Sequence, residues 1–281
     1  MKVLVTGANG QLGYDVIKRL NALGDEPVGA DREEFDITDS KATEDYITAL
    51  RPDVIVHCAA YTAVDKAEDD RDTCRKVNVD GTRNIALACE KIGAKLVYIS
   101  SDYVFGGSGT QPLEIDAPKN PQNIYGITKL GGEEEAKKCQ KHFIVRTSWV
   151  FGINGGNFVK TMLRLADSHE KLTVVDDQTG SPTYTPDLAR LICDMIKTEK
   201  YGTYHASNEG YCTWAEFAKE IMRQAGKATE IVPCTTAEYP AKAKRPENSR
   251  LSKKCLNDAG FDRLPPWQDA LARFLKELDL A

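Results

Sequence analysis

The chain has 281 residues, of which 41% are hydrophobic and 28% are charged, and this ordinary globular composition excludes a disordered, collagen-like or coiled-coil protein. Its 37 basic and 42 acidic residues give a net charge of −5, so no overall positive field attracts nucleic acid or an anionic membrane. The length predicts one or two domains.

Strand and helix patterns alternate through the first half of the chain. Short apolar runs predict strands at residues 2–6, 27–30, 53–56, 95–100 and 142–146. Apolar residues at helical spacing predict helices at residues 11–23, 40–50, 73–92 and 125–138. This alternation is typical of right-handed βαβ units, so we predict an α/β protein with a Rossmann-like, doubly wound parallel sheet.

The alternation becomes less regular after residue 148. Helices are predicted at residues 158–166, 186–197, 213–225 and 266–278, and short strands at 172–175, 202–206 and 230–232. Residues 176–185 and 233–248 are rich in Pro, Gly, Thr and Asn and are predicted to be loops. We predict a nucleotide-binding domain at 1–148 and a smaller C-terminal α/β substrate-binding domain at 149–281, with part of the second half returning to the first sheet.

The cysteines and the first residues indicate where the protein works. None of the eight cysteines forms a C-x-x-C pair, so we expect reduced, mostly buried thiols, as in a cytoplasmic protein. An apolar strand pattern begins at Val3, which leaves no room for a signal peptide. No apolar run approaches the roughly 18 residues of a membrane span, so we expect no membrane partner.

A glycine-rich turn, with Gly7, Gly10 and Gly13, lies between the first strand and the first helix. Gly7 suits the tight turn, Gly10 lets the backbone approach a pyrophosphate, and Gly13 lets the helix pack closely against the sheet. The N–H groups at the start of the helix would face the phosphates. Glycines alone are weak evidence, because turns also favour them, but the strand before and the helix after predict dinucleotide binding.

Asp31 follows the second strand, where a carboxylate typically binds the adenosine ribose and favours NAD. Arg32 is adjacent and could accept the 2′-phosphate of NADP instead. A solvated Asp-Arg turn is nearly as good an interpretation, so the choice of cofactor stays open at this point.

Tyr125 and Lys129 are four residues apart and share one face of a predicted helix. An ammonium beside a phenol lowers the tyrosine pKa, which predicts a proton donor and acceptor near neutral pH. Lys129 could also hold the nicotinamide ribose. The alternative is an ordinary helix start with an exposed lysine, but the glycine-rich turn in the same α/β unit favours the functional interpretation.

A third group of polar residues, Ser100, Ser101, Asp102 and Tyr103, ends the fourth strand. A hydroxyl there could bind a substrate carbonyl while Tyr125 protonates it, although a polar strand-to-loop turn is the alternative. Trp149 follows the fifth strand and is expected to face the same crevice, where an indole could stack on a sugar or base. His57 is interpreted as a core or supporting residue.

Together these motifs resemble the extended short-chain dehydrogenase/reductase superfamily and, within it, the dTDP-4-dehydrorhamnose reductase family. The narrower resemblance rests on segments spread over nearly the whole chain: 5–13, 35–39, 59–68, 78–79, 100–106, 125–129, 146–151, 177–183 and 245–251. It implies that NADPH, with NADH also accepted, reduces the 4-keto group of dTDP-4-dehydro-β-L-rhamnose to dTDP-β-L-rhamnose. This is the last step in the synthesis of that sugar donor.

The resemblance also implies residue roles. Tyr125 would donate the proton, Lys129 would tune Tyr125 and anchor the cofactor ribose, and Ser101, commonly Thr in relatives, would bind the 4-keto oxygen. The other implied contacts are Asp102, Tyr103 and Trp149 at the sugar; Gly10, Gln11 and Leu12 at the pyrophosphate; Asp36 and Ile37 at the adenine; and Ala59, Ala60 and Tyr61 at the middle of the cofactor. Some members carry Mg²⁺ at a dimer contact. We see no clustered carboxylates here and predict no metal, while a monomer and a homodimer both stay open.

Two other enzyme classes of the superfamily fit less well. A nucleotide-sugar 4,6-dehydratase usually has an Asp-Glu pair after the Ser or Thr, but Tyr103 follows Asp102. An epimerising GDP-sugar reductase needs an added Cys/His pair, and neither Ser101 nor Asp102 is a cysteine. A non-enzymatic alternative is the NADP-binding regulatory subunit of methionine adenosyltransferase. The intact Ser101, Tyr125 and Lys129 favour an enzyme.

Overall fold

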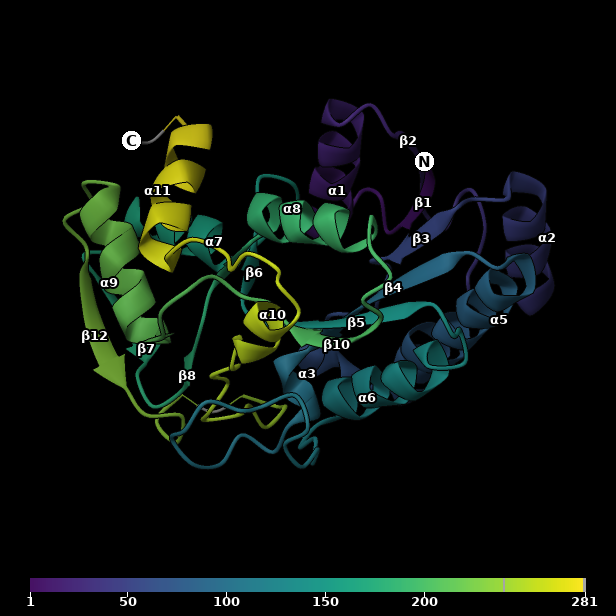
Figure 1. Cartoon of the computed structure of the whole chain (residues 1–281). Helices are drawn as coiled ribbons and strands as arrows, with labels where there is room; N and C mark the ends of the chain where they lie inside the picture. The colour runs from purple at the N-terminus through teal and green to yellow at the C-terminus, as the bar shows by residue number, and fades with distance from the viewer. Residues whose placement is uncertain (240, 280–281) are drawn as a thin grey trace.

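A six-stranded parallel sheet lies in the part of the molecule that contains the N-terminus (Figure 1). The computed structural model describes residues 1–239 and 241–279. The sheet has the order β10-β5-β4-β3-β1-β2. Its strands are β1 (Lys2–Thr6), β2 (Glu26–Ala30), β3 (Val54–His57), β4 (Lys95–Ser101), β5 (His142–Thr147) and β10 (Gly202–His205). The order changes direction between β1 and β3, which creates a crevice at the carboxyl ends of these strands.

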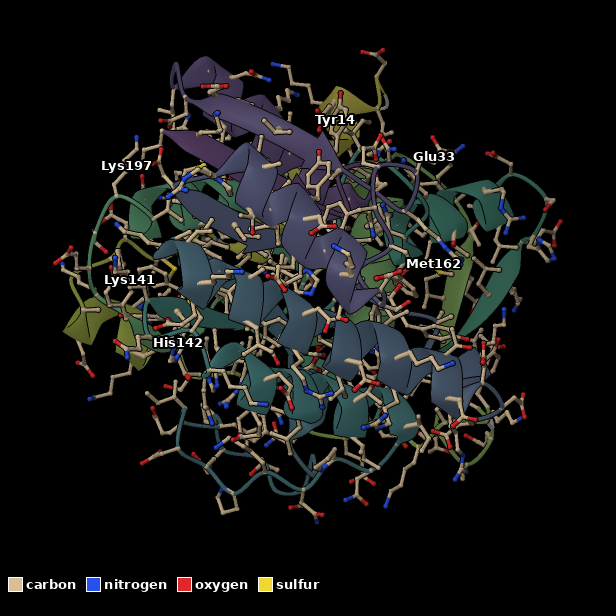
Figure 2. The ribbon with its side chains drawn as sticks, turned by 90° about the vertical axis from the view of Figure 1, so that its right-hand side faces the viewer. Tyr14, Glu33, Lys141, His142, Met162 and Lys197 are labelled. Carbon is tan, nitrogen blue, oxygen red and sulfur yellow. The ribbon has the colours of Figure 1, made fainter. Side chains whose placement is uncertain are left out.

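Helices cover both faces of this sheet, and each face has its own apolar core. Val3 and Val5 of β1 pack in the core beneath α1 (Gln11–Ala22) and α8 (Thr185–Met195). Leu4 points the other way, toward α2 (Ser40–Leu50), α5 (Thr82–Ile92) and α6 (Ile124–Ala136). Alternate residues of a strand face opposite sides, so a nearly continuous apolar run is needed when both faces are buried. The predicted doubly wound α/β fold is confirmed, and α2 and α5 face the viewer in Figure 2.

The helix predicted at 73–92 is interrupted by a wider turn. The segment begins with α4 (Arg71–Arg75), continues as the π-helix η1 (Lys76–Gly81) and ends as α5. Asn78, which lies within the π-helix, is buried. Such π segments are rare and often lie at functional sites. The short helix α3 (Val64–Ala67), just before this segment, was not predicted.

The second half of the chain builds a smaller unit around its own apolar cluster, which includes Phe151, Phe217 and Phe274. Strand β7 (Lys171–Val175) pairs in parallel with β12 (Glu230–Cys234). The helices of this unit are α7 (Phe158–Ala166), α9 (Trp214–Gln224) and α11 (Trp267–Glu277), seen on the left in Figure 1. All predicted helices and strands are present, and their ends agree within two residues.

Several short elements were not predicted. Strand β8 (Thr179–Gly180) pairs with β11 (Cys212–Thr213), and β9 (Thr183–Tyr184) pairs with β6 (Val150–Phe151), so the stretch 176–185 is not entirely loop. The 3-10 helix η2 (Asp102–Val104) follows β4, and α10 (Lys254–Asp258) lies near β10. The β8–β11 and β6–β9 pairings join segments that are distant in the sequence, so short-range patterns do not reveal these strands.

Segments from the second half of the chain also complete the first sheet. Strand β10 forms an edge of that sheet beside β5, and helix α8 packs against α1. The two parts therefore share an extensive boundary, and the crevice lies along it. Within the described residues, no helix is long and apolar enough to cross a membrane.

Candidate active site

A cavity of about 1000 Å³ lies at the carboxyl ends of the parallel strands. Residues from both parts of the molecule line it, including Gly10 and Ser101 from the first half and Trp149 from the second. Of the predicted site residues, those that line this cavity are Gly7, Gly10, Gln11, Leu12, Gly13, Asp31, Arg32, Asp36, Ile37, Ala59, Ala60, Ser101, Asp102, Tyr103, Tyr125, Lys129 and Trp149. Tyr61 is the exception.

The glycine-rich turn requires glycine at two positions for steric reasons. Gly7 has a φ of +69°, and a Cβ there would lie 2.7 Å from the backbone nitrogen of Ala59. A Cβ on Gly13 would lie 2.1 Å from the carbonyl oxygen of Gly7. The sequence interpretation assigned Gly13 to helix–sheet packing, but the closest obstacle is the turn itself. Gly10 is the N-cap of α1 and offers no side-chain cap, which leaves N–H groups available to an anion.

A loop from the second half of the chain crosses this turn. The Gln11 side-chain oxygen accepts hydrogen bonds from the Gly152 backbone N–H at 3.1 Å and from the Asn157 amide at 3.0 Å. The Asn154 amide donates to the Asn9 carbonyl at 2.7 Å. Because this loop connects β6 to α7, it ties the second unit directly to the predicted pyrophosphate region.

Asp31 and Arg32 have different surroundings at the rim of the cavity. One Asp31 carboxylate oxygen accepts a hydrogen bond from the Asn9 backbone N–H at 3.0 Å, so this side chain is tied to the glycine-rich turn. The Arg32 side chain is 88% exposed and pairs with Asp36 at 3.3 Å. Hydrogen bonds from Thr38 lower the pKa of Asp36. Arg32 is therefore held only by a weak surface ion pair.

Ser101 and Tyr125 are brought together by the close contact between α6 and the end of β4. The Asn123 side chain caps α6 by accepting a hydrogen bond from the Gly126 N–H at 2.8 Å. A Cβ on Gly126 would lie 2.3 Å from the Tyr103 carbonyl oxygen, so glycine is needed for this approach. Burial raises the pKa of Tyr125, and a hydrogen bond with Ser101 opposes that rise. Ser101 and Tyr125 both line the cavity.

Lys129 does not act on Tyr125 in the way that the helical spacing predicts. Its ammonium donates a 2.6 Å hydrogen bond to the Ile99 carbonyl and lies 4.2 Å from the centre of the Tyr98 ring. Burial lowers the Lys129 pKa to about 7. The predicted lowering of the Tyr125 pKa is therefore wrong, because desolvation of the buried phenol is the dominant effect.

Asp102 is a buried residue at the start of η2 and lines the cavity. The Ser101 hydroxyl donates to one oxygen of its carboxyl group at 2.8 Å. The other oxygen, Oδ2, is buried and has no hydrogen-bond partner among the described residues. Burial raises the Asp102 pKa to about 6, while the hydrogen bond from Ser101 opposes the rise. This carboxyl group can exchange a proton close to neutral pH.

Trp149 lines the cavity in a strained backbone conformation, with a φ of +49°. Its ring is stacked on that of Trp214, with ring centres 3.7 Å apart and planes 14° apart. On the β8 side, a Cβ on Gly180 would lie 2.8 Å from the Trp149 indole. Trp214 and Gly180 therefore both pack closely against the Trp149 indole.

Tyr61 lies outside the cavity lining because its backbone and hydroxyl are engaged elsewhere. Its N–H donates to the Asn78 side chain at 2.8 Å, and the Asn78 amide donates to its carbonyl at 3.1 Å. The Tyr61 hydroxyl donates to Asp70. His57 is a buried core residue between Thr6 and Thr82, and burial lowers its pKa to about 3, in agreement with its interpretation as a core histidine.

Comparison with known proteins agrees with this architecture over the whole chain. The model of the family described as RmlD substrate binding domain matches residues 1–280. The dTDP-4-dehydrorhamnose reductase of Escherichia coli is 38% identical, over 99% of this chain and 98% of the relative. This chain belongs to the dTDP-4-dehydrorhamnose reductase family. It is also 43% identical to the spore coat polysaccharide biosynthesis protein SpsK of Bacillus subtilis, over 98% of this chain and 97% of that protein.

Solved structures of the reductase family have the same fold. The dTDP-4-dehydrorhamnose reductase of Clostridium acetobutylicum is 42% identical, with a TM-score of 0.97 over 99% of this chain and all of that one. The Bacillus anthracis enzyme, solved in complex with NADP, is 45% identical with a TM-score of 0.96, over 98% of this chain and 99% of that one.

Trp214 and the loop residue Gly155 are among the cavity-lining residues of this family member that were not predicted from the sequence. Glycine and asparagine in residues 152–157, directly after an apolar strand, form the same kind of signal as the first glycine-rich turn. No local signal marks Trp214, because its contact with Trp149 joins two distant segments.

Proposed function

We propose that this chain catalyses the NAD(P)H-dependent reduction of dTDP-4-dehydro-β-L-rhamnose to dTDP-β-L-rhamnose. The observation that carries this proposal is the meeting of Ser101, Tyr125 and Lys129 in one cavity with the glycine-rich turn. The similarity to dTDP-4-dehydrorhamnose reductases over almost the whole chain supports the choice of substrate.

The cofactor would lie along the glycine-rich turn. The N–H groups that follow Gly10, at Gln11 and Leu12, would bind the pyrophosphate. The closely packed backbone at Gly7 and Gly13 would hold the turn in the shape that this binding needs. The remaining cofactor residues would be Asp36 and Ile37 at the adenine, Ala59 and Ala60 in the middle, and Lys129 at the nicotinamide ribose. When bound, the reduced nicotinamide supplies the hydride.

We favour NADPH over NADH, and expect both to be accepted. Asp31 already accepts a hydrogen bond from Asn9, whereas the exposed Arg32 side chain is free to leave its surface partner and contact a 2′-phosphate. The NADP complex of the similar Bacillus anthracis enzyme agrees with this preference.

The chain's own residues would supply the proton and the orientation. Tyr125 donates its hydroxyl proton to the oxygen of the former 4-keto group. The Ser101 hydroxyl, which donates to Asp102 in the structure, would turn to donate a hydrogen bond to that oxygen and orient it. A phenol with a raised pKa remains protonated in the resting enzyme and therefore suits a proton donor. Asp102, Tyr103 and Trp149 would surround the sugar. Residues 1–148 would form the cofactor-binding domain and 149–281 the interleaved substrate-binding domain.

A coupled assay tests this function directly. The substrate is generated by an upstream dehydratase and a 3,5-epimerase, and the absorbance of NADPH or NADH is followed. Cofactor oxidation that requires both the epimerase and this protein would establish the reductase. A folded protein that binds NADPH but oxidises none of it would instead favour another sugar nucleotide or a non-catalytic regulatory subunit.

A further inference from the structure

Helix α6 carries three charged or reactive side chains on one face. Tyr125, Lys129 and Glu133 follow one another at intervals of four residues, so they lie in a row along the helix. The first two have proposed roles in the reaction. Glu133, by contrast, is fully buried and does not line the cavity.

Glu133 connects helix α6 to strands β4 and β5 of the first sheet through a buried ion pair and a hydrogen bond. Its two carboxylate oxygens accept hydrogen bonds from Nε and Nη2 of Arg146 on β5, each at 2.7 Å. The Ser100 hydroxyl on β4 donates to the same carboxylate at 2.6 Å. Glu133 is 0% and Arg146 2% exposed, so solvent does not screen this pair. Removing one partner of such a pair leaves an uncompensated buried charge.

The position of Ser100 makes this pair relevant to the reaction. Ser100 immediately precedes Ser101, and both line the cavity together with Tyr125. The hydrogen bond from Ser100 to Glu133 therefore holds the end of β4 against the helix that carries Tyr125. Arg146 extends the connection by donating to the Ile115 carbonyl at 2.8 Å.

Glu133 also influences the charge at Lys129, one helical turn away. Burial lowers the Lys129 pKa, and Glu133 is the largest of the effects that raise it again. The other titratable groups near Lys129 are Tyr125 on the same helix, His57 and Cys58 at the end of β3, Cys74 on α4 and Tyr98 on β4. Burial favours the neutral form of His57 and of Cys58. Glu133 is thus the group in this set that supplies a fixed negative charge.

We propose that Glu133 is a positioning residue that holds the face of α6 carrying Tyr125 and Lys129 against β4, and that its carboxylate, one helical turn from Lys129, favours the ammonium form of that side chain. This inference rests on the proposed function for the importance of Lys129. The influence of Glu133 on the charge of Lys129 can be tested without any substrate.

Three variants separate the charge effect from a loss of packing. Glu133→Gln keeps the shape of the side chain but leaves Arg146 unpaired. Glu133→Gln combined with Arg146→Met removes both charges, which relieves the penalty of a single buried charge. The matched control is Glu135→Gln on the same helix, because Glu135 also binds an arginine through both oxygens, Arg83, but at the partly exposed surface.

The main readout is the titration of the Lys129 side chain by NMR in protein labelled with ¹³C-lysine, with the resonance assigned by its loss in Lys129→Met. We expect the Lys129 midpoint to fall by about one pH unit in Glu133→Gln, which is the size of effect that a nearby charge exerts. The double variant should show a smaller shift in the same direction, because Arg146 repulsion is also removed. Glu135→Gln should titrate like the unchanged protein.

The second readout is NADPH affinity as a function of pH, measured by fluorescence. Above the Lys129 midpoint, Glu133→Gln should bind NADPH up to about tenfold more weakly, following the one-unit shift. If Glu133→Gln does not fold, the double variant decides. A double variant that is stable and titrates at the unchanged midpoint would reduce Glu133 to a packing role and overturn the proposal. Failure of the proposed function would look different: no sugar-nucleotide turnover by the unchanged protein, whatever its Lys129 titration.

Discussion

The Asn154 side chain donates a 2.7 Å hydrogen bond to the carbonyl oxygen of Asn9, which joins the loop after β6 to the glycine-rich turn. Gly155, the next residue, lines the cavity. The two sides of the crevice are thus attached to each other at the predicted pyrophosphate site. A cofactor bound along the turn would contact both halves of the chain.

This relationship predicts that Asn154→Ala weakens cofactor binding. Loss of one hydrogen bond that orders the turn should raise the NADPH dissociation constant about threefold to tenfold. Fluorescence titration measures the constant, and turnover at saturating NADPH should change little. Asn21→Ala, an exposed position on α1, is the control. Equal affinity in both variants would show that the loop contact does not support the cofactor site.

Tyr125→Phe tests the proton donor. The change keeps the ring, including its edge-on contact with Tyr103 at 5.5 Å between ring centres, but removes the hydroxyl. We expect turnover to fall by about 100-fold or more, while NADPH binding is retained. Tyr14→Phe on the exposed surface of α1, labelled in Figure 2, provides a matched control. Unchanged turnover in Tyr125→Phe would remove this residue from the proton-donating role.

Trp214 is expected to act on the substrate through Trp149. Trp214→Ala removes the ring that stacks on Trp149, so the indole in the cavity becomes free to reorient. Loss of about 1 kcal/mol of stacking should raise the KM for the sugar nucleotide roughly fivefold, with the KM for NADPH unchanged. Trp214→Phe keeps an aromatic face and should lie close to the unchanged enzyme. Equal effects on both KM values would point to a general loss of structure instead.

Asp102 should make stability depend on pH in a defined direction. Burial raises its pKa from 3.8 to about 6, so the folded protein holds this proton more tightly than the unfolded chain does. Stabilisation from this group is complete below about pH 4 and is lost as the pH rises toward 6, by about 3 kcal/mol in total.

Asp102→Asn is neutral at every pH and should not show this loss. The free energy of unfolding, measured with urea from about pH 4 to 7, should therefore shift in favour of the variant as the pH rises. Asp116→Asn in the exposed loop after η2 is the control. A difference between Asp102→Asn and the unchanged protein that stays constant over this range would contradict a raised Asp102 pKa.

Much of the fold and of the cavity lining could be predicted from local patterns. The spacing of apolar residues identifies each strand and helix. Residues on one face of a strand recur every second position, whereas those on one face of a helix recur every three or four positions. The glycine-rich turn and the Tyr125–Lys129 pair were recognisable for the same reason, since their geometry is built within a few residues. The exception among the predicted site residues is Tyr61, which Asn78 holds outside the cavity lining.

The sequence by itself therefore determined the order of the elements, the doubly wound sheet and the residues that gather at its carboxyl edge. Only the tertiary structure decided the contacts between distant segments, such as Asn9 with Asn154, 145 residues apart, and Trp149 with Trp214. It also decided the protonation behaviour of Tyr125 and Lys129. Desolvation is the sum of contributions from atoms of many segments, and helical spacing describes the neighbours on one helix but not that burial.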